Sequence, residues 1–119
     1  MQFDLVLLGI GPDGHTASLF PNDENAASQD DSVLVVATGS APKAPAERIS
    51  LSRACISQQL EGRIVFVAGG REKNAVLRQV LGRGGELVEE RSEVPFSLFA
   101  RRAVFILDEQ SGAGLSERK

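Results

Sequence analysis

The residues of this sequence best suited to chemistry lie in one glycine-rich loop, GIGPDGH, at residues 9–15. His15 is the single histidine of the chain, and imidazole is the side chain whose charge changes near neutral pH, so it can take a proton from water. Asp13 stands two residues earlier, where a carboxylate can orient the ring or bind a substrate hydroxyl. A lone loop histidine also occurs as a helix cap beside a turn-forming aspartate, and chemistry alone leaves both interpretations open.

The same loop formally satisfies the dinucleotide-binding pattern G-x-G-x-x-G through Gly9, Gly11 and Gly14. That pattern also requires a full helix after the third glycine and an acidic residue at the end of the next strand, about 20 residues on. Pro21 cuts the helix short, and the next predicted strand ends at Thr38. The context therefore argues against nucleotide binding.

The loop instead follows a predicted buried strand, and open α/β sheets bind ligands beyond the carboxyl ends of their strands. Gly11 and Gly14 let a ligand approach the backbone closely. We expect residues 15–20 to form at most two helical turns, whose free N–H groups would suit an anion or a developing oxyanion.

The elements that must position this loop alternate between strands and helices. Runs of consecutive apolar residues indicate strands buried on both faces, and the stretch after Gly70 has apolar residues at helical spacing. The alternation predicts an α/β fold, with a mostly parallel sheet flanked by helices. The expected strands cover residues 3–9, 32–38, 63–68 and 102–107, with an extended stretch at 48–52 and helices at 53–60 and 71–82.

The expected helices are too few to cover such a sheet on both faces. Only residues 71–82 predict a helix of about three turns, and residues 22–31 form a polar connector without an apolar period. We therefore expect the chain to be part of a larger sheet, with an exposed edge and apolar face that favour self-association or pairing with another segment.

Composition narrows the class of protein. A chain of 119 residues fits one domain, and its net charge of -3 gives no general attraction to nucleic acid or to an anionic membrane. No apolar run approaches the roughly 20 residues of a membrane span. Cys55 and His15 are the single residues of their types, too few for a structural zinc site or an internal disulfide. We expect no metal, no leader peptide and a reducing, cytoplasmic setting.

At this point the motifs resemble those of the 6-phosphogluconolactonase family. The signature segment of that family is similar to FDLVLLGIGPDGHTASLFP, and its proline- and lysine-containing loop with the following strand is similar to SAPKAPAERISLS. The resemblance continues through VFVAGGREKNAVLRQVL and ends in EVPFSLF and VFILDEQSGAGL, so it covers nearly the whole chain. It implies the fold shared by these lactonases, glucosamine-6-phosphate deaminases and ribose-5-phosphate isomerases.

The resemblance also implies a reaction and a set of site residues. The reaction is hydrolysis of 6-phosphoglucono-1,5-lactone to 6-phosphogluconate in the oxidative pentose phosphate pathway, without a metal or organic cofactor. It implies that His15 is the general base and Asp13 its catalytic partner, within a loop whose Gly11 and Gly14 contact substrate. Substrate-binding residues with a basic side chain, suited to the phosphate, are Lys43, Arg48 and Lys73.

Members of the resembled family are considerably longer than this chain. The matched motifs belong to their carboxyl-terminal half, so residues 1–119 are expected to form a single partial domain. Two alternatives remain at this stage. One is a deaminase or isomerase acting on a sugar phosphate. The segment TASLFP after the histidine argues against it, because it resembles the lactonases and deaminases continue differently. The other is a non-catalytic remnant that binds a sugar phosphate or a partner protein.

Overall fold

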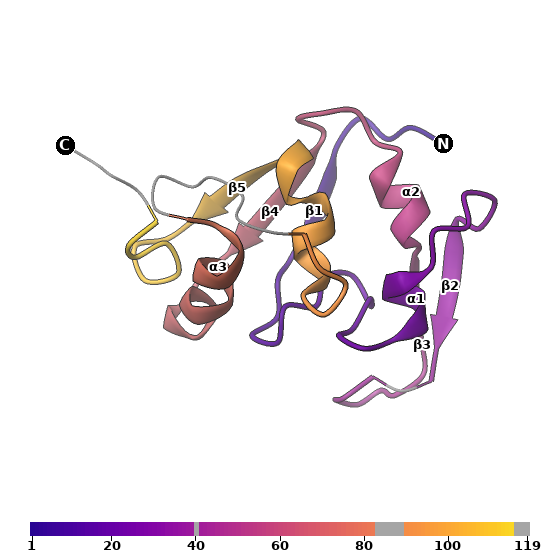
Figure 1. Cartoon of the computed structure of the whole chain (residues 1–119), viewed down its shortest axis with the longest axis horizontal. Coiled ribbons are helices and arrows are strands. Elements are labelled where there is room, and N and C mark those ends of the chain that lie inside the picture. Colours follow the sequence, from indigo (N-terminus) through magenta and orange to yellow (C-terminus); the bar gives the residue numbers. More distant parts are fainter. Residues whose placement is uncertain (40, 83–89, 116–119) are drawn as a thin grey trace.

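The computed structural model describes residues 1–39, 41–82 and 90–115 and shows an α/β arrangement (Figure 1). Strands β1, β4 and β5 form one sheet, strands β2 and β3 form a second, and short helices pack around them. The elements in chain order are β1 (Val6–Leu8), α1 (Glu24–Ala27), β2 (Val35–Thr38), β3 (Arg48–Leu51), α2 (Arg53–Ser57), β4 (Ile64–Ala68), the 3-10 helix η1 (Arg71–Lys73), α3 (Asn74–Val80), the 3-10 helix η2 (Pro95–Arg102) and β5 (Ala103–Leu107).

The larger sheet is wholly parallel, which confirms the predicted fold class. Its strand order is β1-β4-β5, with Val6 opposite Ile64 and Ile64 opposite Ala103. These strands lie within the three apolar runs that predicted them, and each is joined to the next by a segment long enough for the crossover that parallel pairing requires.

The run at residues 32–38 is a strand, but its predicted place in the parallel sheet was wrong. It forms β2, which pairs antiparallel with β3 in a separate two-stranded sheet, with Val35 opposite Leu51 and Thr38 opposite Arg48. The physical reason is the connection, since residues 39–47 are too few for a crossover helix and suffice only for a hairpin. The extended stretch predicted at 48–52 is confirmed as β3.

The helices follow the sequence pattern in part. The segment predicted at 71–82 forms η1 and α3, with Val76, Leu77 and Val80 buried, and the segment predicted at 53–60 contains α2. The polar connector contains an unpredicted helix, α1, because the Asp23 side chain accepts a hydrogen bond from the Asn25 N–H and caps it.

The short helix expected at residues 15–20 does not form. These residues make a tight turn in which the Leu19 N–H donates to the Thr16 carbonyl at 2.9 Å, and Ala17 takes a left-handed backbone conformation with φ of 51°. Such a residue cannot continue a right-handed helix. In the part of the chain that the structure describes, no helix is long and apolar enough to cross a membrane.

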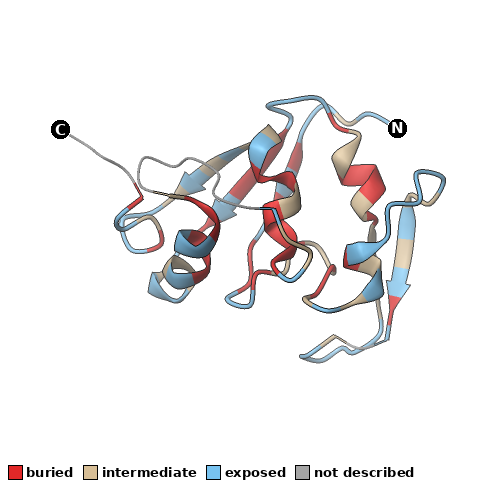
Figure 2. Cartoon of the chain, viewed as in Figure 1, coloured by how far each residue is buried: buried red, intermediate tan, exposed pale blue. Residues whose placement is uncertain are grey.

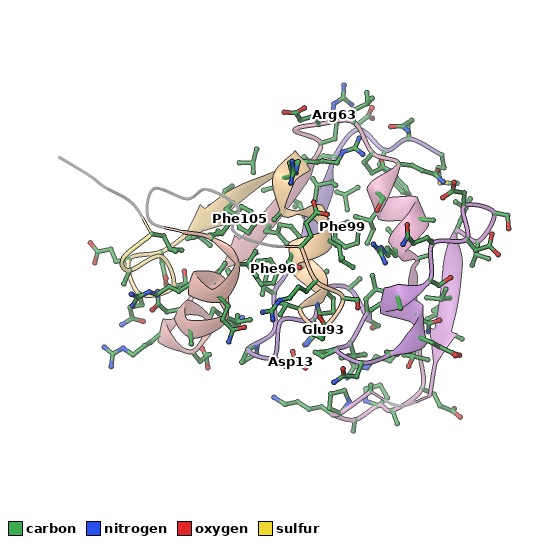
Figure 3. All side chains as sticks on the ribbon, viewed as in Figure 1. Asp13, Arg63, Glu93, Phe96, Phe99 and Phe105 are labelled. Carbon is green, nitrogen blue, oxygen red and sulfur yellow. The ribbon has the colours of Figure 1, made fainter. Side chains whose placement is uncertain are left out.

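The core lies between the parallel sheet and the helices on one of its faces (Figure 2). Phe66 of β4 stacks on Phe105 of β5 with ring centroids 5.0 Å apart, and Phe96 of η2 meets Phe66 edge to face at 5.9 Å. Figure 3 shows Phe96, Phe99 and Phe105 gathered around η2 and β5. This aromatic packing fixes the sheet beneath the loop that carries His15.

Candidate active site

The parallel pairing of β1 and β4 places the segments that follow these two strands at one edge of the sheet. Leu8 at the end of β1 lies opposite Phe66 of β4, so the loop beginning at Gly9 and the turn at Gly69 leave the sheet side by side. This is the edge at which open α/β sheets bind their ligands.

The glycine-rich loop closes on itself through backbone hydrogen bonds. The Gly11 N–H donates to the His15 carbonyl and the Gly14 N–H to the Gly11 carbonyl, each at 2.9 Å. The buried Thr16 hydroxyl donates to the Gly9 carbonyl at 2.8 Å. The N–H groups of residues 15–20 were expected to be free for an anion, and for His15 and Ser18 that expectation was wrong. The His15 N–H donates to Asp13 Oδ1 and the Ser18 N–H to Ser50 Oγ, each at 3.0 Å.

Gly14 is needed by the loop for its backbone and for space. Its φ of 93° is a conformation that L side chains rarely adopt, and a Cβ there would lie 2.7 Å from the Val94 Cγ1 atom. The close contact with Val94 joins the loop to the start of η2, where the Phe96 N–H donates to the Gly14 carbonyl at 3.0 Å.

Asp13 and His15 form a directly hydrogen-bonded pair at the surface of the loop. Asp13 Oδ1 accepts a hydrogen bond from the His15 backbone N–H at 3.0 Å and lies 2.7 Å from His15 Nδ1. Partial burial alone would raise the pKa of Asp13, but the hydrogen bonds from the His15 backbone and ring, with the charge of that ring, outweigh it and lower the pKa. Asp13 is therefore ionised at neutral pH and can only accept hydrogen bonds. Nδ1 therefore carries the proton of this hydrogen bond, and in the neutral form of the ring the lone pair lies on Nε2.

The ring of His15 is held between the loop backbone and Phe20. A Cβ atom on Gly11 would lie 2.2 Å from both Nδ1 and Cε1 of the ring, so the ring occupies the space that a side chain would fill. On its other side the ring lies 4.8 Å from the Phe20 ring, centroid to centroid. The absence of a side chain at Gly11 therefore leaves the space that the His15 ring occupies.

One hollow beside His15, of about 370 Å³, contains the predicted basic residues of the β2–β3 connection. Arg48 donates from Nε to the Pro45 carbonyl and from Nη2 to the Lys43 carbonyl, each at 2.9 Å, and its Cζ atom lies 5.4 Å from the centroid of the Phe20 ring. Two of the five N–H groups of Arg48 donate these hydrogen bonds to the β2–β3 connection, and the others can donate to an anion. The lining residues are Pro12, Asp13, His15, Phe20, Pro42, Lys43 and Arg48.

His15 also lines a second hollow, of about 470 Å³, which contains Lys73. Lys73 ends η1, which begins after a turn at Gly70, where φ is 98°. The residues that line this hollow are Leu7, Leu8, Gly9, Ile10, Gly11, His15, Ala17, Val67 and Lys73.

Asp108, at the end of β5, fixes the turn that precedes Lys73. Its carboxylate accepts hydrogen bonds from the Gly70 N–H at 3.1 Å and from the Ser111 N–H at 2.8 Å. Hydrogen bonds from the backbone N–H groups of Ser111 and Gly70 lower the pKa of Asp108, so the carboxylate is ionised and remains an acceptor. The Ser111 hydroxyl in turn donates to the Ala68 carbonyl at 3.0 Å, which ties the ends of β4 and β5 together.

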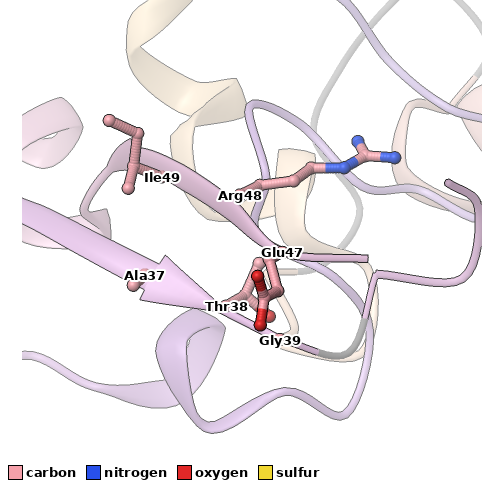
Figure 4. Close-up of a pocket in the computed structure, with 6 residues that line it drawn as sticks. All are labelled: Ala37, Thr38, Gly39, Glu47, Arg48 and Ile49. Carbon is pink, nitrogen blue, oxygen red and sulfur yellow. The ribbon is translucent and has the colours of Figure 1, made fainter. Parts of the chain in front are cut away.

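A third hollow, of about 540 Å³, lies at the end of the β2–β3 sheet where Thr38 pairs with Arg48 (Figure 4). Figure 4 shows the Arg48 side chain extending away from Ile49, as expected for neighbours in a strand. The Arg48 guanidinium therefore lies on the side of β3 that faces the hollow lined by His15. The hollow itself is lined by Ala37, Thr38, Gly39, Glu47, Arg48 and Ile49.

The structure brings the predicted site residues together around His15. Lys43 and Arg48 share one hollow with it and Lys73 shares the other, although these residues are widely separated along the chain. Sequence reasoning missed Phe20, which separates the histidine from Arg48, and Asp108, which supports the turn before Lys73. A single acidic residue directly after a predicted strand was the available signal for Asp108. Within the described ranges, no three His, Cys, Asp or Glu side chains are grouped so as to hold a metal ion.

A parallel α/β sheet whose ligand-binding edge carries a histidine, a carboxylate hydrogen-bonded to it and flanking cations defines the class: an α/β protein with a candidate site for an anionic ligand. Comparison with known proteins narrows it. The family model described as glucosamine-6-phosphate isomerases/6-phosphogluconolactonase matches residues 1–106. The chain belongs to this family.

Similar proteins within the family are lactonases. The chain is 34% identical to 6-phosphogluconolactonase of Rattus norvegicus over 117 residues, which cover 96% of this chain and 42% of the rat protein. It superimposes on the structure of 6-phosphogluconolactonase from Trypanosoma brucei with a TM-score of 0.77 and 30% identity, covering 96% of this chain and 43% of that one. The chain thus spans less than half the length of these relatives.

A monomeric glucosamine-6-phosphate deaminase shares the fold, with a TM-score of 0.65, 17% identity and coverage of 92% of this chain and 47% of that one. At this identity the likeness concerns the fold alone. The lactonase relatives, at 34% and 30% identity, therefore favour the lactonase interpretation over the deaminase alternative.

Proposed function

We propose that this protein hydrolyses 6-phosphoglucono-1,5-lactone to 6-phosphogluconate, with His15 as general base. The observation that carries the proposal is the 2.7 Å contact between Asp13 and His15 Nδ1 between two hollows with basic side chains, in a member of the lactonase family. The bare Nε2 atom is the proton acceptor that hydrolysis of a lactone requires.

The chemistry balances with one histidine. His15 Nε2 takes a proton from water as the water oxygen bonds to the lactone carbonyl carbon, C1, and the carbonyl electrons move to its oxygen. When that tetrahedral intermediate collapses, the bond from C1 to the ring oxygen breaks, and the proton on Nε2 passes to the departing oxygen. Asp13 holds the ring in this tautomer and stabilises the imidazolium that forms between the two steps.

Lys43, Arg48 and Lys73 are proposed to bind the charged part of the substrate. Arg48 can grip a phosphate with two parallel hydrogen bonds, while the lysines act as point charges. Gly11 and Gly14 contribute to substrate binding through the loop shape that they permit. The pathway step, the absence of a cofactor and the cytoplasmic location belong to the same proposal and rest on the resemblance to the lactonase family.

The proposal is tested by incubating the purified chain with the phosphorylated lactone and measuring 6-phosphogluconate formation above the spontaneous rate. The expected result is catalysis that His15→Gln reduces by at least about 100-fold, the lower range for loss of a general base. Arg63→Gln, a change far from the site at the amino end of β4, serves as the control. A His15→Gln variant that retains the parent rate would remove His15 from the role of base.

A further inference from the structure

Phe20 is a buried aromatic residue that packs against the candidate active site. It is 4% exposed, yet in the described part of the chain it is not a member of the main cluster of core residues. The centroid of its ring lies 4.8 Å from that of the His15 ring, and the Arg48 Cζ atom lies over the ring at 5.4 Å from the centroid. The packing of Phe20 therefore concerns the candidate site more than the main core.

The turn that leads into Phe20 is joined both to β3 and to the core. The Ser18 N–H donates to the Ser50 Oγ atom of β3 at 3.0 Å, and Leu19 is fully buried in the core cluster. Ser50 and Arg48 are alternate residues of β3, so their side chains leave the strand on the same face. The turn and the Arg48 side chain are therefore held relative to each other, and Phe20 contacts this side chain.

Both contacts of the Phe20 ring are attractive. The rings of Phe20 and His15 are inclined by 41°, and their separation falls within the range of roughly 4.5 to 7 Å that favourable aromatic pairs adopt. The Arg48 guanidinium lies within the distance of about 6 Å at which the face of an aromatic ring attracts a cation. An aliphatic side chain could fill the same space but would offer neither interaction.

We infer that Phe20 is a positioning residue, which sets the distance between His15 and Arg48. This inference rests on the proposed function, in which His15 takes a proton from water and Arg48 binds the charged part of the substrate. The lactone carbonyl and the phosphate belong to one small molecule, so the base and the cation must act on it together. A rigid ring in contact with both groups holds them in place before the substrate binds, which lowers the cost of ordering them.

The test replaces Phe20 by leucine, which keeps an apolar side chain and removes the aromatic face. Misplacing a reacting group by about 1 Å costs on the order of 100-fold in rate, and a His15 ring that is released part of the time should lose at least about tenfold in kcat. The preference in kcat/KM for the phosphorylated lactone over the unphosphorylated one should fall by about two- to fivefold, the equivalent of one lost cation–π contact. A loss of folded protein alone would lower both rates equally and leave this preference unchanged.

A measurement without substrate separates this inference from the proposed function. The nitrogen NMR signals of the His15 ring report which nitrogen carries the proton, and the 2.7 Å contact with Asp13 places it on Nδ1 in the parent chain. Phe20→Leu should give a mixture of the two neutral forms, because the ring can then turn away from Asp13. If the parent chain does not hydrolyse the lactone, the proposed function fails, and these signals still decide whether Phe20 positions the ring.

Phe99→Leu is the matched control, because Phe99 is also buried, belongs to the core cluster and lines neither hollow beside His15. This variant should be less stable than the parent chain but keep its substrate preference and its His15 signals. If Phe20→Leu fails to fold, the parent chain decides, because nuclear Overhauser contacts must join the protons of the His15 and Phe20 rings.

Four results would overturn the inference. They are parent-like His15 signals in a folded Phe20→Leu variant, an unchanged preference for the phosphorylated lactone in that variant, equal changes in the Phe20 and Phe99 variants, and no Overhauser contact between the two rings in the parent chain.

Discussion

Replacing Gly11 by alanine should displace the His15 ring without unfolding the protein. A Cβ at this position would lie 2.2 Å from two ring atoms of His15 and 2.9 Å from Asp13 Oδ1. Carbon contacts are stable at about 3.5 Å or more, so the ring must withdraw by about 1.3 Å. A shift of that size breaks the 2.7 Å hydrogen bond to Asp13.

The expected loss of activity follows from this displacement. Misplacing a reacting group by about 1 Å costs on the order of 100-fold in rate, and Gly11→Ala should reduce lactone hydrolysis by about that factor. Its effect on stability should stay within about 1 kcal/mol, because the His15 side chain is partly exposed and can swing into solvent.

Gly9→Ala is the matched control within the same loop, because a Cβ at Gly9 would meet no atom within 4 Å. His15 is the single histidine of the sequence, so its ring resonances can be assigned directly. The ring signals should move in the Gly11 variant and stay at their parent positions in the Gly9 variant. Parent-like ring signals and an unchanged hydrolysis rate for Gly11→Ala would refute the described packing of the ring.

Three further changes test other parts of the site. Thr16→Val removes the 2.8 Å hydrogen bond to the Gly9 carbonyl and should cost about 1 to 2 kcal/mol of unfolding free energy in urea denaturation; an unchanged midpoint would argue against this anchor. The pKa of Asp13 is lower in the folded protein than in the unfolded chain. The ionised carboxylate therefore stabilises the fold at pH values above the unfolded pKa of about 3.9, and this contribution is lost as the pH falls through the folded pKa. Asp13→Asn should therefore flatten the acid side of the stability profile, whereas a profile identical to that of the parent would contradict the lowered pKa. Lys73→Ala should raise KM for the phosphorylated lactone more than for the unphosphorylated one, and equal effects on both would argue against a phosphate contact.

The strands of the parallel sheet could be predicted from the sequence, whereas the pairing of β2 and the helix η2 could not. Uninterrupted apolar runs predict strands with both faces apolar, and the core residues of β1 and β4 follow that pattern. The run at 32–38 has the same character, yet it pairs in the separate sheet, since apolar pattern does not specify a pairing partner. The 3-10 helix η2 was not predicted, although its buried residues Phe96, Phe99 and Ala100 recur at helical spacing, because a segment this short gives the spacing little weight.

The site was predictable where its residues are close in the sequence. The spacing of two residues between Asp13 and His15 suggested their contact, and the structure shows it. Gathering Arg48 and Lys73 around the same histidine depends on tertiary packing that no local pattern encodes, and only the family resemblance pointed to them. The role of Gly11 in making room for the ring depends on the folded loop in the same way.

The most direct test of the central claim is an NMR titration of the chain with 6-phosphogluconate, the product of the proposed reaction, and in parallel with gluconate, which lacks the phosphate. The titration monitors the site through the ring signals of the single histidine, and it does not depend on catalysis. The account predicts that 6-phosphogluconate shifts the His15 ring signals and the amide signals near Arg48 and Lys73, at concentrations where gluconate has little effect. Unmoved His15 signals, or equal shifts with both compounds, would contradict a phosphate-binding site centred on His15.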